Sequence, residues 1–597
     1  MSASGEKIRS AIVVVALASF AGAVAWRLVS IHTGRYEVAV RNSYVFTRSV
    51  QALRGAVMSR ATSDTRPGYT YATSVPIWEY HADPASVNLN RHSREHVVTN
   101  VALALGLPEA RVREAFSNWR SRYVPLGTSD SDDANRLMTN RKLVSGVSVE
   151  EKQVRRYPQG RHLANVLGFV TKDPTNSVGG AGLEMRYESW LKGVPGLIRG
   201  AKDAHGNEIR ERRIVTKNPE RGQTVHLTID HTVQCDVERE LREGLAACQA
   251  QAGWAIVLEA ETGAVLAMAS LPDYEPADFN HATKEMQRNR AIGENLEPGS
   301  VMKTITACAV LNEGLVTPDT MMNTSQFEEG YYKLPGDHGH KWEPLMSVRD
   351  GLVHSSNIVY GKLGVKLGPA KLWRYFKAFG FGRKSGIDLP GEEIGILPPP
   401  KKWDKTSWSR APIGQFVSVT PMQMAAAYGA VANGGRLMRP YVVDHITDAR
   451  GETTYRRLPE EVGRPITAET ARRVRQMMLG VAKKGGTARR AAVKGYTVAG
   501  KTGTAQISLP GWRGYTPGEY NGSFIGIVPA SSPKLVILVT YHRPRYCSSW
   551  DRSKSEGIPL FNHQGGVCAA PVFSRIAASV LAYLEIEPDA PEELGDS

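Results

Sequence analysis

The pattern of apolar residues begins with a long run near the N-terminus. The run covers residues 11–25 and continues, interrupted only by Arg27, to Ile31. It approaches the roughly 20 residues that a membrane-spanning helix needs, and Arg27 can extend its charge to the membrane surface. The triplet Ala23-Val24-Ala25 is typical of a signal-peptide cleavage site, so a removable signal is the alternative. We favour an uncleaved anchor over residues 10–31.

The next region, up to about residue 221, has an irregular and basic pattern. Residues 69–77 alternate in the manner of a β-strand, whereas residues 97–105 and 110–119 have helical spacing. Residues 128–133 are polar, and we expect them to form a loop. This region has no group of residues typical of a catalytic site, which predicts a non-catalytic domain.

A change of pattern at about residue 222 marks a second domain. Residues 225–230 alternate like a strand, and residues 232–251 have helical spacing. Two apolar runs at 254–258 and 264–269 predict a β-hairpin. Predicted helices and strands continue to about residue 586, and we expect the acidic tail beyond them to be disordered. The predicted organisation is a cytoplasmic tail (1–9), an anchor (10–31), an N-terminal domain (32–221), a second domain (222–586) and an acidic tail (587–597).

Composition narrows the range of functions. The 597 residues exceed what one hydrophobic core usually supports, and 42% hydrophobic with 22% charged residues is typical of globular domains. The formal net charge of +15 suits nucleic acid, an anionic membrane or an acidic polymer equally well. Since the sequence shows no nucleic-acid-binding module, we expect no nucleic-acid partner. The five cysteines lack CxxC and zinc-ligand spacing, so we expect no metal site.

Two further groups have side chains of reactive or metal-binding types. Asp337, His338 and His340 lie in a segment rich in Gly and Pro without obvious further ligands, so we expect a solvent-exposed loop. Cys547 and Cys568 bracket a polar stretch. In an oxidising compartment they would either form a disulfide or remain two thiols, and the sequence does not decide between these states.

Candidate chemistry comes from the pattern S-x-x-K, which occurs four times. Three copies lie in uninformative contexts, namely Ser4 to Lys7, Ser189 to Lys192 and Ser531 to Lys534. The fourth, Ser300 to Lys303, follows Pro298-Gly299 and opens an apolar helical pattern. A spacing of three on a helix predicts that the Lys303 amine lies beside the Ser300 hydroxyl. The helix start also directs free backbone N–H groups toward this serine.

A serine hydroxyl is a weak nucleophile until a base removes its proton, and a lysine can be that base only when it is neutral. Lowering a lysine pKa from about 10.4 toward 7 takes roughly 4 kcal/mol of desolvation or repulsion by another cation. Lys501, in Lys501-Thr502-Gly503-Thr504 after a strand-like segment, is a candidate for that cation. A similar triplet at 384–386 lies in a predicted loop and is the weaker candidate.

A third element, Ser355-Ser356-Asn357, lies between two helical patterns, and its competitor at residues 86–88 lies in the other domain. A hydroxyl beside a carboxamide can relay a proton and hold a substrate amide. The motifs S-x-x-K, S-x-N and K-T-G, in this order within one domain, match the set of penicillin-binding proteins and class A β-lactamases.

With these motifs the chain resembles the class B penicillin-binding proteins, most closely the cell-division type known as penicillin-binding protein 3. The resemblance covers nearly the whole length. Outside the three motifs it rests on Arg54-Gly55-Ala56-Val57, Arg156-Tyr157-Pro158, Gly182-Leu183-Glu184, residues 386–392, residues 419–423, Ala570-Pro571-Val572-Phe573 and residues 586–590. The chain departs from the family after Arg54, where Met58-Ser59-Arg60 and a longer insertion replace an acidic residue and a compact glycine turn.

The resemblance implies an α+β fold: a serine β-lactamase-like transpeptidase domain, in which helices flank an antiparallel sheet, with an elongated N-terminal pedestal domain and one transmembrane helix. It implies a peptidoglycan D,D-transpeptidase in which Ser300 attacks the penultimate D-alanine of a stem peptide and forms an acyl-enzyme. The implied roles are Lys303 as general base, Ser355 and Asn357 in proton transfer and orientation, Lys501 and Thr502 in carboxylate binding, and Gly503, Thr504 and Ser300 at the oxyanion hole. Such enzymes need no metal or organic cofactor.

The same resemblance implies partners and a location. We expect peptidoglycan stem peptides as substrates, β-lactams as covalent inhibitors, and a polytopic lipid II polymerase and other division proteins as partners in septal wall synthesis. We expect a single-pass protein of the bacterial cytoplasmic (inner) membrane, with Lys7 and Arg9 in the cytoplasm and the catalytic domain in the periplasm. Two alternatives remain: a D,D-carboxypeptidase or β-lactamase that uses the same site for hydrolysis, and a β-lactam-binding sensor or scaffold.

Overall fold

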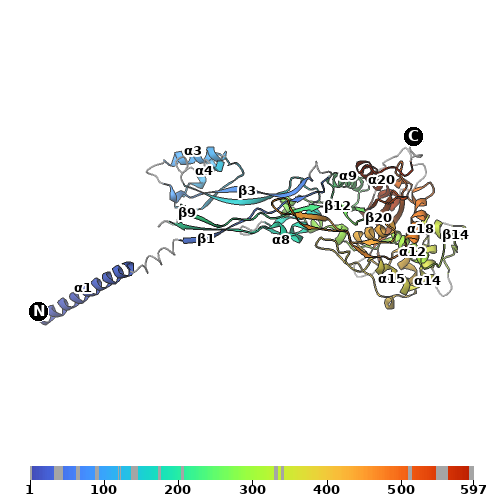
Figure 1. Cartoon of the computed structure of the whole chain (residues 1–597), viewed down its shortest axis with the longest axis horizontal. Coiled ribbons are helices and arrows are strands. Elements are labelled where there is room, and N and C mark those ends of the chain that lie inside the picture. The colour runs from blue at the N-terminus through green and yellow to red at the C-terminus, as the bar shows by residue number, and fades with distance from the viewer. Residues whose placement is uncertain are drawn as a thin grey trace. The chain divides into compact units, whose positions relative to one another are not determined.

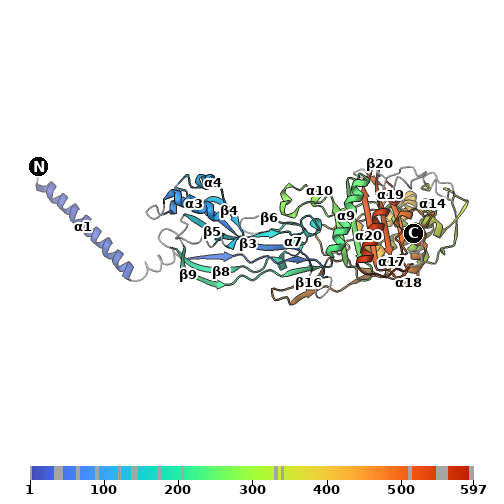
Figure 2. The same cartoon turned by 90° about the horizontal axis from the view of Figure 1, so that it is seen from above.

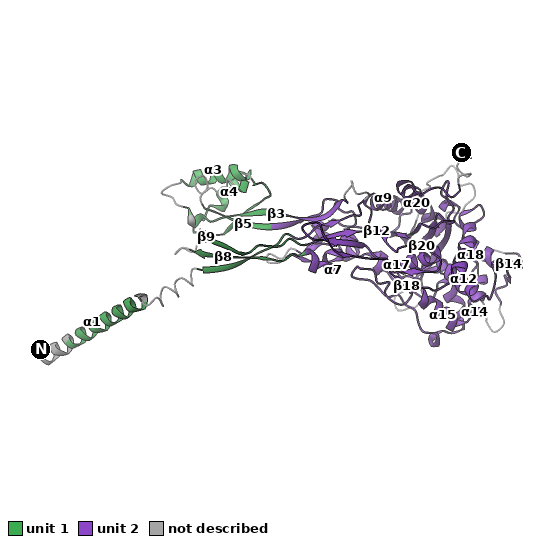
Figure 3. Ribbon diagram, in the orientation of Figure 1, with its two compact units in different colours: residues 1–53, 76–152, 192–222 green, residues 54–75, 153–191, 223–597 purple. Residues whose placement is uncertain are grey.

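A computed structural model (Figure 1) describes residues 3–32, 45–61, 68–87, 93–118, 120–121, 123–132, 134–135, 146–171, 177–202, 208–327, 334–337, 342–508, 514–545 and 563–590. The chain divides into two compact units (Figure 3). Unit 1 comprises Met1–Leu53, Pro76–Lys152 and Lys192–Gly222. Unit 2 comprises Arg54–Val75, Gln153–Leu191 and Gln223–Ser597. Each unit is therefore assembled from separate stretches of sequence.

The apolar run at the N-terminus forms the helix α1 (Ala3–His32). Its segment Ala11–Ser30 has a mean hydropathy of 2.1, and none of it is buried inside the protein. An exposed apolar helix of 20 residues is long enough to cross the hydrocarbon core of a bilayer, so α1 is a candidate membrane span. A second apolar stretch, Gly565–Tyr583, is 56% buried and belongs to the interior of unit 2, as expected of a core helix.

Unit 1 contains a small antiparallel sheet and a helical core. The sheet has the order β1 (Val45–Val50), β8 (Gly196–Lys202), β9 (Glu208–Lys217). In the core, α3 (Arg94–Leu105) and α4 (Glu109–Ala115) bury Val101 and Val112 in one cluster with residues of β4 (Val124–Ser129). Helical spacing therefore predicted both helices, although α4 ends before the predicted position.

The centre of unit 2 is a five-stranded antiparallel sheet, and the predicted α+β fold is confirmed. Its order is β12 (Val265–Leu271), β11 (Ala252–Glu259), β21 (Leu535–His542), β20 (Tyr515–Val528), β19 (Ala499–Ser508). The pair β11 and β12 is the hairpin predicted from the two apolar runs. Side chains of β11 alternate between the faces of the sheet, because Ala255 and Val257 lie in one hydrophobic cluster, whereas Ile256 and Leu258 lie in another.

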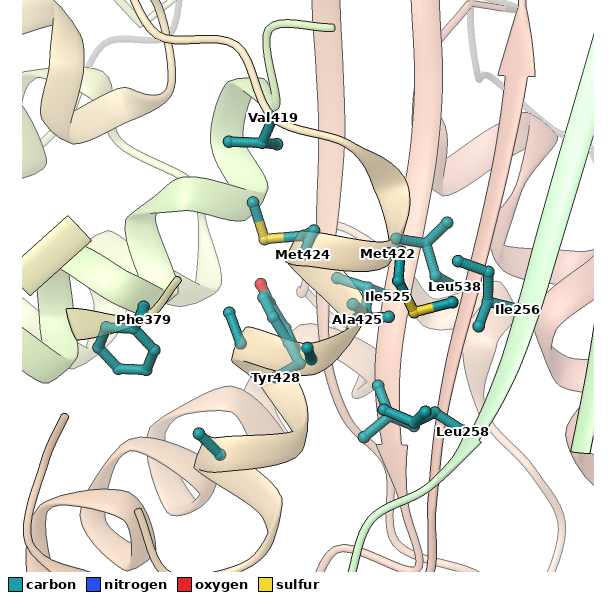
Figure 4. Packing of buried hydrophobic residues seen from close by; sticks show 14 of the residues in the cluster. Ile256, Leu258, Phe379, Val419, Met422, Met424, Ala425, Tyr428, Ile525 and Leu538 are labelled. Atoms are coloured by element: carbon teal, nitrogen blue, oxygen red, sulfur yellow. The ribbon is translucent and has the colours of Figure 1, made fainter. Parts of the chain in front are cut away.

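Helices cover both faces of this sheet. On one face α9 (His231–Ala247) and α20 (Ala570–Tyr583) pack together (Figure 2). On the other face lies α17 (Pro421–Ala432), all of whose residues are buried. Figure 4 shows Met422 of α17 among the strand residues Ile525 and Leu538. Since each large apolar side chain contributes roughly 1.5–3 kcal/mol when buried, this layer is a main source of stability.

The start of α17 explains the motif around Pro421. Thr420 Oγ1 accepts a hydrogen bond from Gln423 N (3.1 Å), and Gln423 Oε1 accepts one from Thr420 N (2.8 Å), so the two residues form a capping box. Pro421 occupies the first turn, where a backbone N–H is not needed. The Gln423 amide also donates to Arg383 O (2.6 Å) and Ile394 O (2.9 Å), which ties a neighbouring loop to the helix.

Arg54 and Glu184, which lie in two separate sequence motifs, form a buried ion pair within unit 2. Arg54 Nε lies 2.7 Å from Glu184 Oε2, and Arg155 Nε lies 2.7 Å from Glu184 Oε1. Arg54 Nη1 also lies 2.6 Å from Glu188 Oε2. Burial lowers the pKa of Arg54, but the charges of Glu184 and Glu188 outweigh this effect and raise it above its ordinary value. We call Arg54, Arg155, Glu184 and Glu188 the paired cluster.

A second sheet of unit 2 contains β10, the strand predicted near residue 225. Its strands in unit 2 include β10 (Thr224–Leu227), β2 (Val57–Met58), β16 (Val443–Thr447) and β17 (Thr453–Arg456). Asp388 stabilises this region, because its carboxylate accepts hydrogen bonds from Val442 N (2.8 Å), Val443 N (3.0 Å) and Tyr187 Oη (2.9 Å). The acidic residue of the 386–392 motif is therefore structural.

The other strands and α-helices complete the described chain. They are β3 (Thr70–Ala82), β5 (Val147–Arg156), α6 (Ala164–Leu167), β6 (Val170–Thr171), β7 (Val178–Gly179), α7 (Gly182–Arg186), α8 (Glu188–Leu191), α10 (Lys284–Gln287), α11 (Arg290–Gly293), α12 (Met302–Asn312), β13 (Met321–Asn323), β14 (Leu345–Ser347), α13 (Val348–Val353), α14 (Asn357–Leu367), α15 (Pro369–Ala378), α16 (Lys405–Arg410), β15 (Leu437–Met438), β18 (Glu461–Gly463), α18 (Ala468–Met478) and α19 (Gly565–Cys568).

The first residues of the acidic tail are bound to unit 2. Asp589 Oδ1 accepts a hydrogen bond from Thr497 N (2.7 Å), and Asp589 Oδ2 accepts from Ser531 N (3.2 Å) and Ser531 Oγ (2.6 Å). Ala590 N donates to Gly495 O (3.0 Å). The expectation of disorder is therefore wrong for these residues, because the aspartate satisfies backbone N–H groups that have no strand partner.

Candidate active site

The candidate nucleophile Ser300 lies at the start of a buried helix. Gly299–Val301 form a 3₁₀ turn that leads directly into α12. Gly299 has a φ of 58°, and a Cβ there would come within 3.2 Å of Thr504 O and Ala505 Cβ. The turn therefore packs closely on β19, and glycine is the residue that tolerates both the backbone angle and the contact. The Ser300 hydroxyl is partly exposed and has no hydrogen-bond partner among the described residues.

Ser355 lies in the short connection between α13 and α14, as the sequence predicts. Its φ of 61° is in the left-handed region, which is uncommon for a residue other than glycine and is often found at functional sites. The next residue, Ser356, caps α14 by accepting a hydrogen bond from Val359 N (3.2 Å). This connection directs Ser355 and Asn357 toward Lys303.

Lys303 and Lys501 both donate to the hydroxyl of Ser355. Lys303 Nζ lies 3.1 Å from Ser355 Oγ, 2.5 Å from Ser355 O and 2.7 Å from Asn357 Oδ1. Lys501 Nζ lies 2.9 Å from Ser355 Oγ and 3.1 Å from Thr502 O. The three sequence motifs therefore meet at one hydroxyl group.

The hydrogen bonds of the Lys303 amine join two of the motifs. The spacing of three residues predicts that the amine lies beside the Ser300 hydroxyl, and the structure adds hydrogen bonds of the amine with Ser355 and Asn357. Ser300 lies in the 3₁₀ turn, two residues before α12 begins at Met302. A buried amine also needs several acceptors, and the Ser355 connection supplies them.

The strand β19 carries Lys501 to the Ser355 hydroxyl, because this strand lies close to the turn that contains Ser300. A Cβ at Gly503 would come within 3.1 Å of Val301 Cγ1, so only glycine fits without displacing a neighbour. Thr504 Oγ1 accepts a hydrogen bond from Gly565 N (3.4 Å), which links the strand to α19. Glycine in the K-T-G motif therefore has a packing reason that is independent of substrate.

Burial lowers the pKa values of both lysines, and repulsion acts in addition on Lys501. Burial lowers the pKa of Lys303 to about 7, although the charge of Asp337 acts in the opposite direction. Burial, followed by repulsion from Lys303, lowers the pKa of Lys501 well below its ordinary value. Two buried ammonium groups that share one acceptor are costly to keep charged. The two lysines are therefore not both charged near neutral pH. This supplies the neutral amine that a general base requires.

Asp337 holds the Ser355–Asn357 connection in place. Its Oδ1 accepts hydrogen bonds from Asn357 N (2.5 Å) and Ile358 N (3.3 Å), and its Oδ2 accepts from Ser356 Oγ (2.6 Å). The side chain is buried, with 9% of the residue exposed. The carboxylate therefore satisfies free N–H groups at the start of α14 and places a negative charge near the lysine pair.

The expectation of a solvent-exposed loop is thus wrong for Asp337. Nothing in its local sequence indicates the contact, because its partner Asn357 lies 20 residues further along the chain. His338 and His340 lie outside the described residues. Within the part of the chain that the structure describes, no group of three or more His, Cys, Asp or Glu is arranged to hold a metal ion.

Glu297 links the nucleophile turn to β20. Its Oε1 accepts a hydrogen bond from Phe416 N (2.9 Å), and its Oε2 accepts one from Tyr515 Oη (2.9 Å). Burial raises the pKa of Glu297, whereas the hydrogen bonds from Phe416 and Tyr515 lower it. The segment that precedes Ser300 is therefore fixed by a buried carboxylate held from two sides.

Comparison with known proteins identifies the family. The penicillin binding protein transpeptidase domain matches residues 253–564, and the penicillin-binding protein dimerisation domain matches residues 49–227. The chain belongs to the penicillin-binding protein transpeptidase family. Stage V sporulation protein D of Bacillus subtilis is 34% identical over 82% of this chain and 73% of its own length. The peptidoglycan D,D-transpeptidase FtsI of Escherichia coli is 30% identical over 97% of this chain and 91% of its own length.

A solved structure extends this similarity to three dimensions. Penicillin-binding protein 3 from Mycobacterium tuberculosis, complexed with aztreonam, has a TM-score of 0.67 and 26% identity, over 91% of this chain and 99% of that one. The expected resemblance to penicillin-binding protein 3 is therefore confirmed, as is the expected combination of a transpeptidase domain with a separate N-terminal domain, which matches the dimerisation domain.

The matched transpeptidase domain of this penicillin-binding protein contains all three motifs and also the competing triplet at 384–386, whereas residues 86–88 lie outside it. Ser86 belongs to unit 1, and Asn88 lies outside the described residues. Ser385 lies in a loop, where its backbone N donates to Glu392 Oε1 (2.6 Å). Cys547 also lies outside the described residues, so the choice between a disulfide with Cys568 and two thiols is not tested.

Proposed function

We propose that this penicillin-binding protein is a peptidoglycan D,D-transpeptidase that acts in septal cell-wall synthesis and uses Ser300 as its nucleophile. The observation that carries the proposal is the convergence of Lys303 and Lys501 on the hydroxyl of Ser355, next to the Ser300 turn. Membership of the transpeptidase family and similarity over almost the whole chain to a relative named peptidoglycan D,D-transpeptidase FtsI support the reaction.

In the proposed reaction Ser300 Oγ attacks the carbonyl carbon of the penultimate D-alanine of a stem peptide. The bond to the terminal D-alanine breaks, and an acyl-enzyme forms. The amine of a neighbouring stem peptide then attacks the ester, which releases Ser300 and leaves a cross-link. Lys303, in its neutral form, accepts the serine proton. The amine is directed at Ser355 in the free enzyme, and catalytic hydrogen bonds often tighten only when substrate binds.

The other motif residues are proposed to bind substrate. Ser355 passes a proton between the lysines and the substrate, and Asn357, whose Nδ2 donates to Gly336 O (2.7 Å), is held to orient a substrate amide. Lys501 and Thr502 bind the terminal carboxylate. Because an arriving anion favours the ammonium form, substrate binding shifts a proton onto Lys501.

The oxyanion hole is proposed to consist of the backbone N–H groups of Ser300 and Thr504. Gly503 allows β19 to approach the nucleophile turn closely enough for both groups to face one oxygen. Loss of one such donor typically costs about 3–4 kcal/mol of transition-state stabilisation, so the position of β19 is as important as the identity of its side chains.

The test is acylation of the full-length protein, in detergent, by a labelled penicillin. We expect one covalent adduct by intact mass, peptide mapping to place it on Ser300, and its loss in Ser300→Ala. Ser531→Ala, in another copy of S-x-x-K, is the matched control and should retain the adduct. A folded protein without an adduct on Ser300 would contradict the proposal.

The lifetime of the adduct distinguishes transfer from hydrolysis. A transpeptidase forms a long-lived penicilloyl-enzyme and, with stem peptide and an acceptor amine, yields a cross-linked dimer. Rapid release of hydrolysed penicillin would instead identify a β-lactamase, and release of D-alanine without cross-linking would identify a carboxypeptidase. A stable adduct without any turnover of stem peptide would identify a sensor or scaffold.

We further propose that α1 remains as a single-pass anchor in the bacterial cytoplasmic membrane. The exposed apolar stretch Ala11–Ser30 supports this, as do the preceding residues Lys7 and Arg9, which favour a cytoplasmic N-terminus. The mass of the mature protein should then include residues 1–25. A polytopic lipid II polymerase and other division proteins are the proposed partners, and a photo-crosslinking residue in α1 should capture such a membrane protein.

A further inference from the structure

A cluster of nucleophilic and basic side chains lies near the start of α9, separate from the active-site motifs. Cys235 Sγ lies 3.6 Å from His231 Nε2 and 3.8 Å from His162 Nδ1. Cys235 and His231 are four residues apart on α9, so they share one face of the helix. Cys235 is half-buried and the His162 side chain is 38% exposed, so small reagents can reach the sulfur.

A buried carboxylate fixes His162. Glu238 Oε2 lies 2.5 Å from His162 Nδ1, and Glu238 Oε1 accepts hydrogen bonds from Leu163 N (2.8 Å) and Gln234 Nε2 (2.6 Å). Because 6% of the Glu238 side chain is exposed, its charge is poorly screened and stabilises the protonated imidazole. His162 is therefore held as a cation beside the sulfur.

Aromatic side chains fix His231. Its ring stacks on Tyr69 with a centroid distance of 4.0 Å, and its Nδ1 lies 3.2 Å from Tyr71 Oη. These contacts leave Nε2 facing Cys235. A thiol between two oriented imidazoles is the arrangement that activates nucleophilic cysteines.

The electrostatic environment favours the thiolate. Burial raises the pKa of Cys235, but hydrogen bonds and charges from His162 and His231 outweigh burial and lower it to about 7. Hydrogen bonds with Cys235 and Glu238 raise the pKa of His162 to about 10. Thiol and imidazole titrate together, as a thiolate–imidazolium pair. The titratable groups around the sulfur are His162, His231, Glu238, Asp230 and Tyr71.

We propose that Cys235 is a second reactive site of this protein, a thiolate that is oxidised by peroxides and alkylated by soft electrophiles. The sulfur attacks one peroxide oxygen, the O–O bond breaks, and the departing hydroxide takes the proton of the His162 imidazolium and leaves as water. Cys235 then carries a sulfenic acid. With iodoacetamide a C–S bond forms and iodide leaves. This chemistry requires neither Ser300 nor transpeptidation.

The test measures alkylation of the full-length protein in detergent by iodoacetamide as a function of pH. Among the described cysteines Cys235 should be alkylated first, with a half-maximal rate near pH 7 rather than the roughly 8.5 of an ordinary thiol. The buried cysteines Cys248 and Cys308 are internal references that should react only after unfolding. Hydrogen peroxide followed by a dimedone trap should label the same residue.

His162→Asn removes one imidazole and should slow alkylation at pH 7 by about tenfold, with the midpoint raised by about one pH unit. His281→Asn is the matched control, because His281 is exposed and lies 2.6 Å from Asp278 rather than near a cysteine. Penicillin acylation of Ser300 reports folding in both variants. If His162→Asn does not fold, the pH profile of alkylation of the unmodified protein tests the proposal instead.

Three results would overturn the proposal. The first is a native midpoint equal to that of the unfolded chain, and the second is an unchanged profile in folded His162→Asn. The third is a metal ion, found by native mass spectrometry, that protects Cys235 and is released by a chelator. None of these results bears on Ser300, so failure here is distinguishable from failure of the proposed transpeptidase.

Discussion

Two groups of buried charges in unit 2 differ in how their charges are balanced. In the paired cluster two guanidinium groups face two carboxylates, and Arg54 Nε lies 2.7 Å from Glu184. In the active-site cluster, defined as Lys303, Lys501 and Asp337, two amines share one serine hydroxyl and the single carboxylate contacts backbone and Ser356 instead. The first group has one carboxylate for each basic side chain, whereas the second has one carboxylate for two basic side chains.

The pKa directions express this difference. Charges of Glu184 and Glu188 overcome burial and raise the pKa of Arg54, whereas burial dominates at Lys303 and Lys501 and lowers theirs. A compensated cluster holds its protons and contributes to stability, while an uncompensated one can release a proton and supply a base. Balance of charge thus separates a structural cluster from a reactive one.

The largest expected effect is on chemistry, from Lys303→Met. Removing the base should slow acylation of Ser300 by a labelled penicillin by about 10²–10⁴-fold. The free energy of unfolding in urea should stay the same or rise, because a buried amine is replaced by an apolar side chain of similar length. Lys371→Met, at an exposed pair with Glu313, should leave acylation unchanged. A large loss of stability in Lys303→Met would show that this amine is structural.

The paired cluster should respond in the opposite way. Glu184→Gln leaves Arg54 and Arg155 without their shared carboxylate and should lower the free energy of unfolding by about 3–5 kcal/mol. Its folded fraction should acylate Ser300 at the normal rate. Glu313→Gln breaks a more exposed pair with Lys371 and should cost less than about 1 kcal/mol. Equal losses in the two variants would contradict the distinction between the clusters.

Asp337→Asn tests the effect of charge within the active-site cluster, because it removes the carboxylate charge that raises the pKa of Lys303. In the unmodified protein, acylation should rise with pH through about 7 as Lys303 loses its proton. Since Asp337 raises the pKa of Lys303, its neutralisation should move this acidic limb to lower pH. The plateau rate should fall about tenfold, because asparagine keeps an oxygen for Asn357 N but replaces the oxygen that accepts from Ser356 Oγ and Trp342 Nε1 with an NH2 donor. An unshifted limb would mean that Asp337 only positions the loop.

The sequence predicts those parts of the site that depend on local pattern. Pro298-Gly299 before an apolar run indicates the start of α12, two short apolar runs indicate β11 and β12, and motif order selects Ser300 over three other copies of S-x-x-K. These features depend on residues within a few positions of one another, where periodicity and turn chemistry act directly.

Contacts between segments that are far apart in the sequence cannot be predicted from local sequence patterns. Asp337 has the same local sequence whether it faces water or the start of α14, and burial decides its role. Cys235 and His162 are 73 residues apart, so no spacing rule relates them. Lys303 and Ser355 are 52 residues apart, so helical spacing does not predict their hydrogen bond. Tertiary packing determines all three.

The smallest expected effect concerns the buried carboxylate of Glu297. Like the carboxylates of the paired cluster it accepts hydrogen bonds, but its donors are neutral groups. Tyr515→Phe removes one hydrogen bond and should lower the free energy of unfolding by about 1 kcal/mol at neutral pH, with acylation changed only a few-fold. Tyr520→Phe in the same strand is the control, since the structure shows no hydrogen bond of its hydroxyl with any described residue.

The pH dependence of this loss tests its cause. The Tyr515 hydroxyl donates to the charged carboxylate and thereby lowers the pKa of Glu297, which burial raises. The stabilisation is therefore present where Glu297 is ionised and is lost as the pH falls through its folded-state pKa. The difference between Tyr515→Phe and the unmodified protein should shrink in acid. A difference that is constant with pH would assign the effect to packing of the ring, and the carboxylate before Ser300 would then be stabilised by Phe416 N without help from β20.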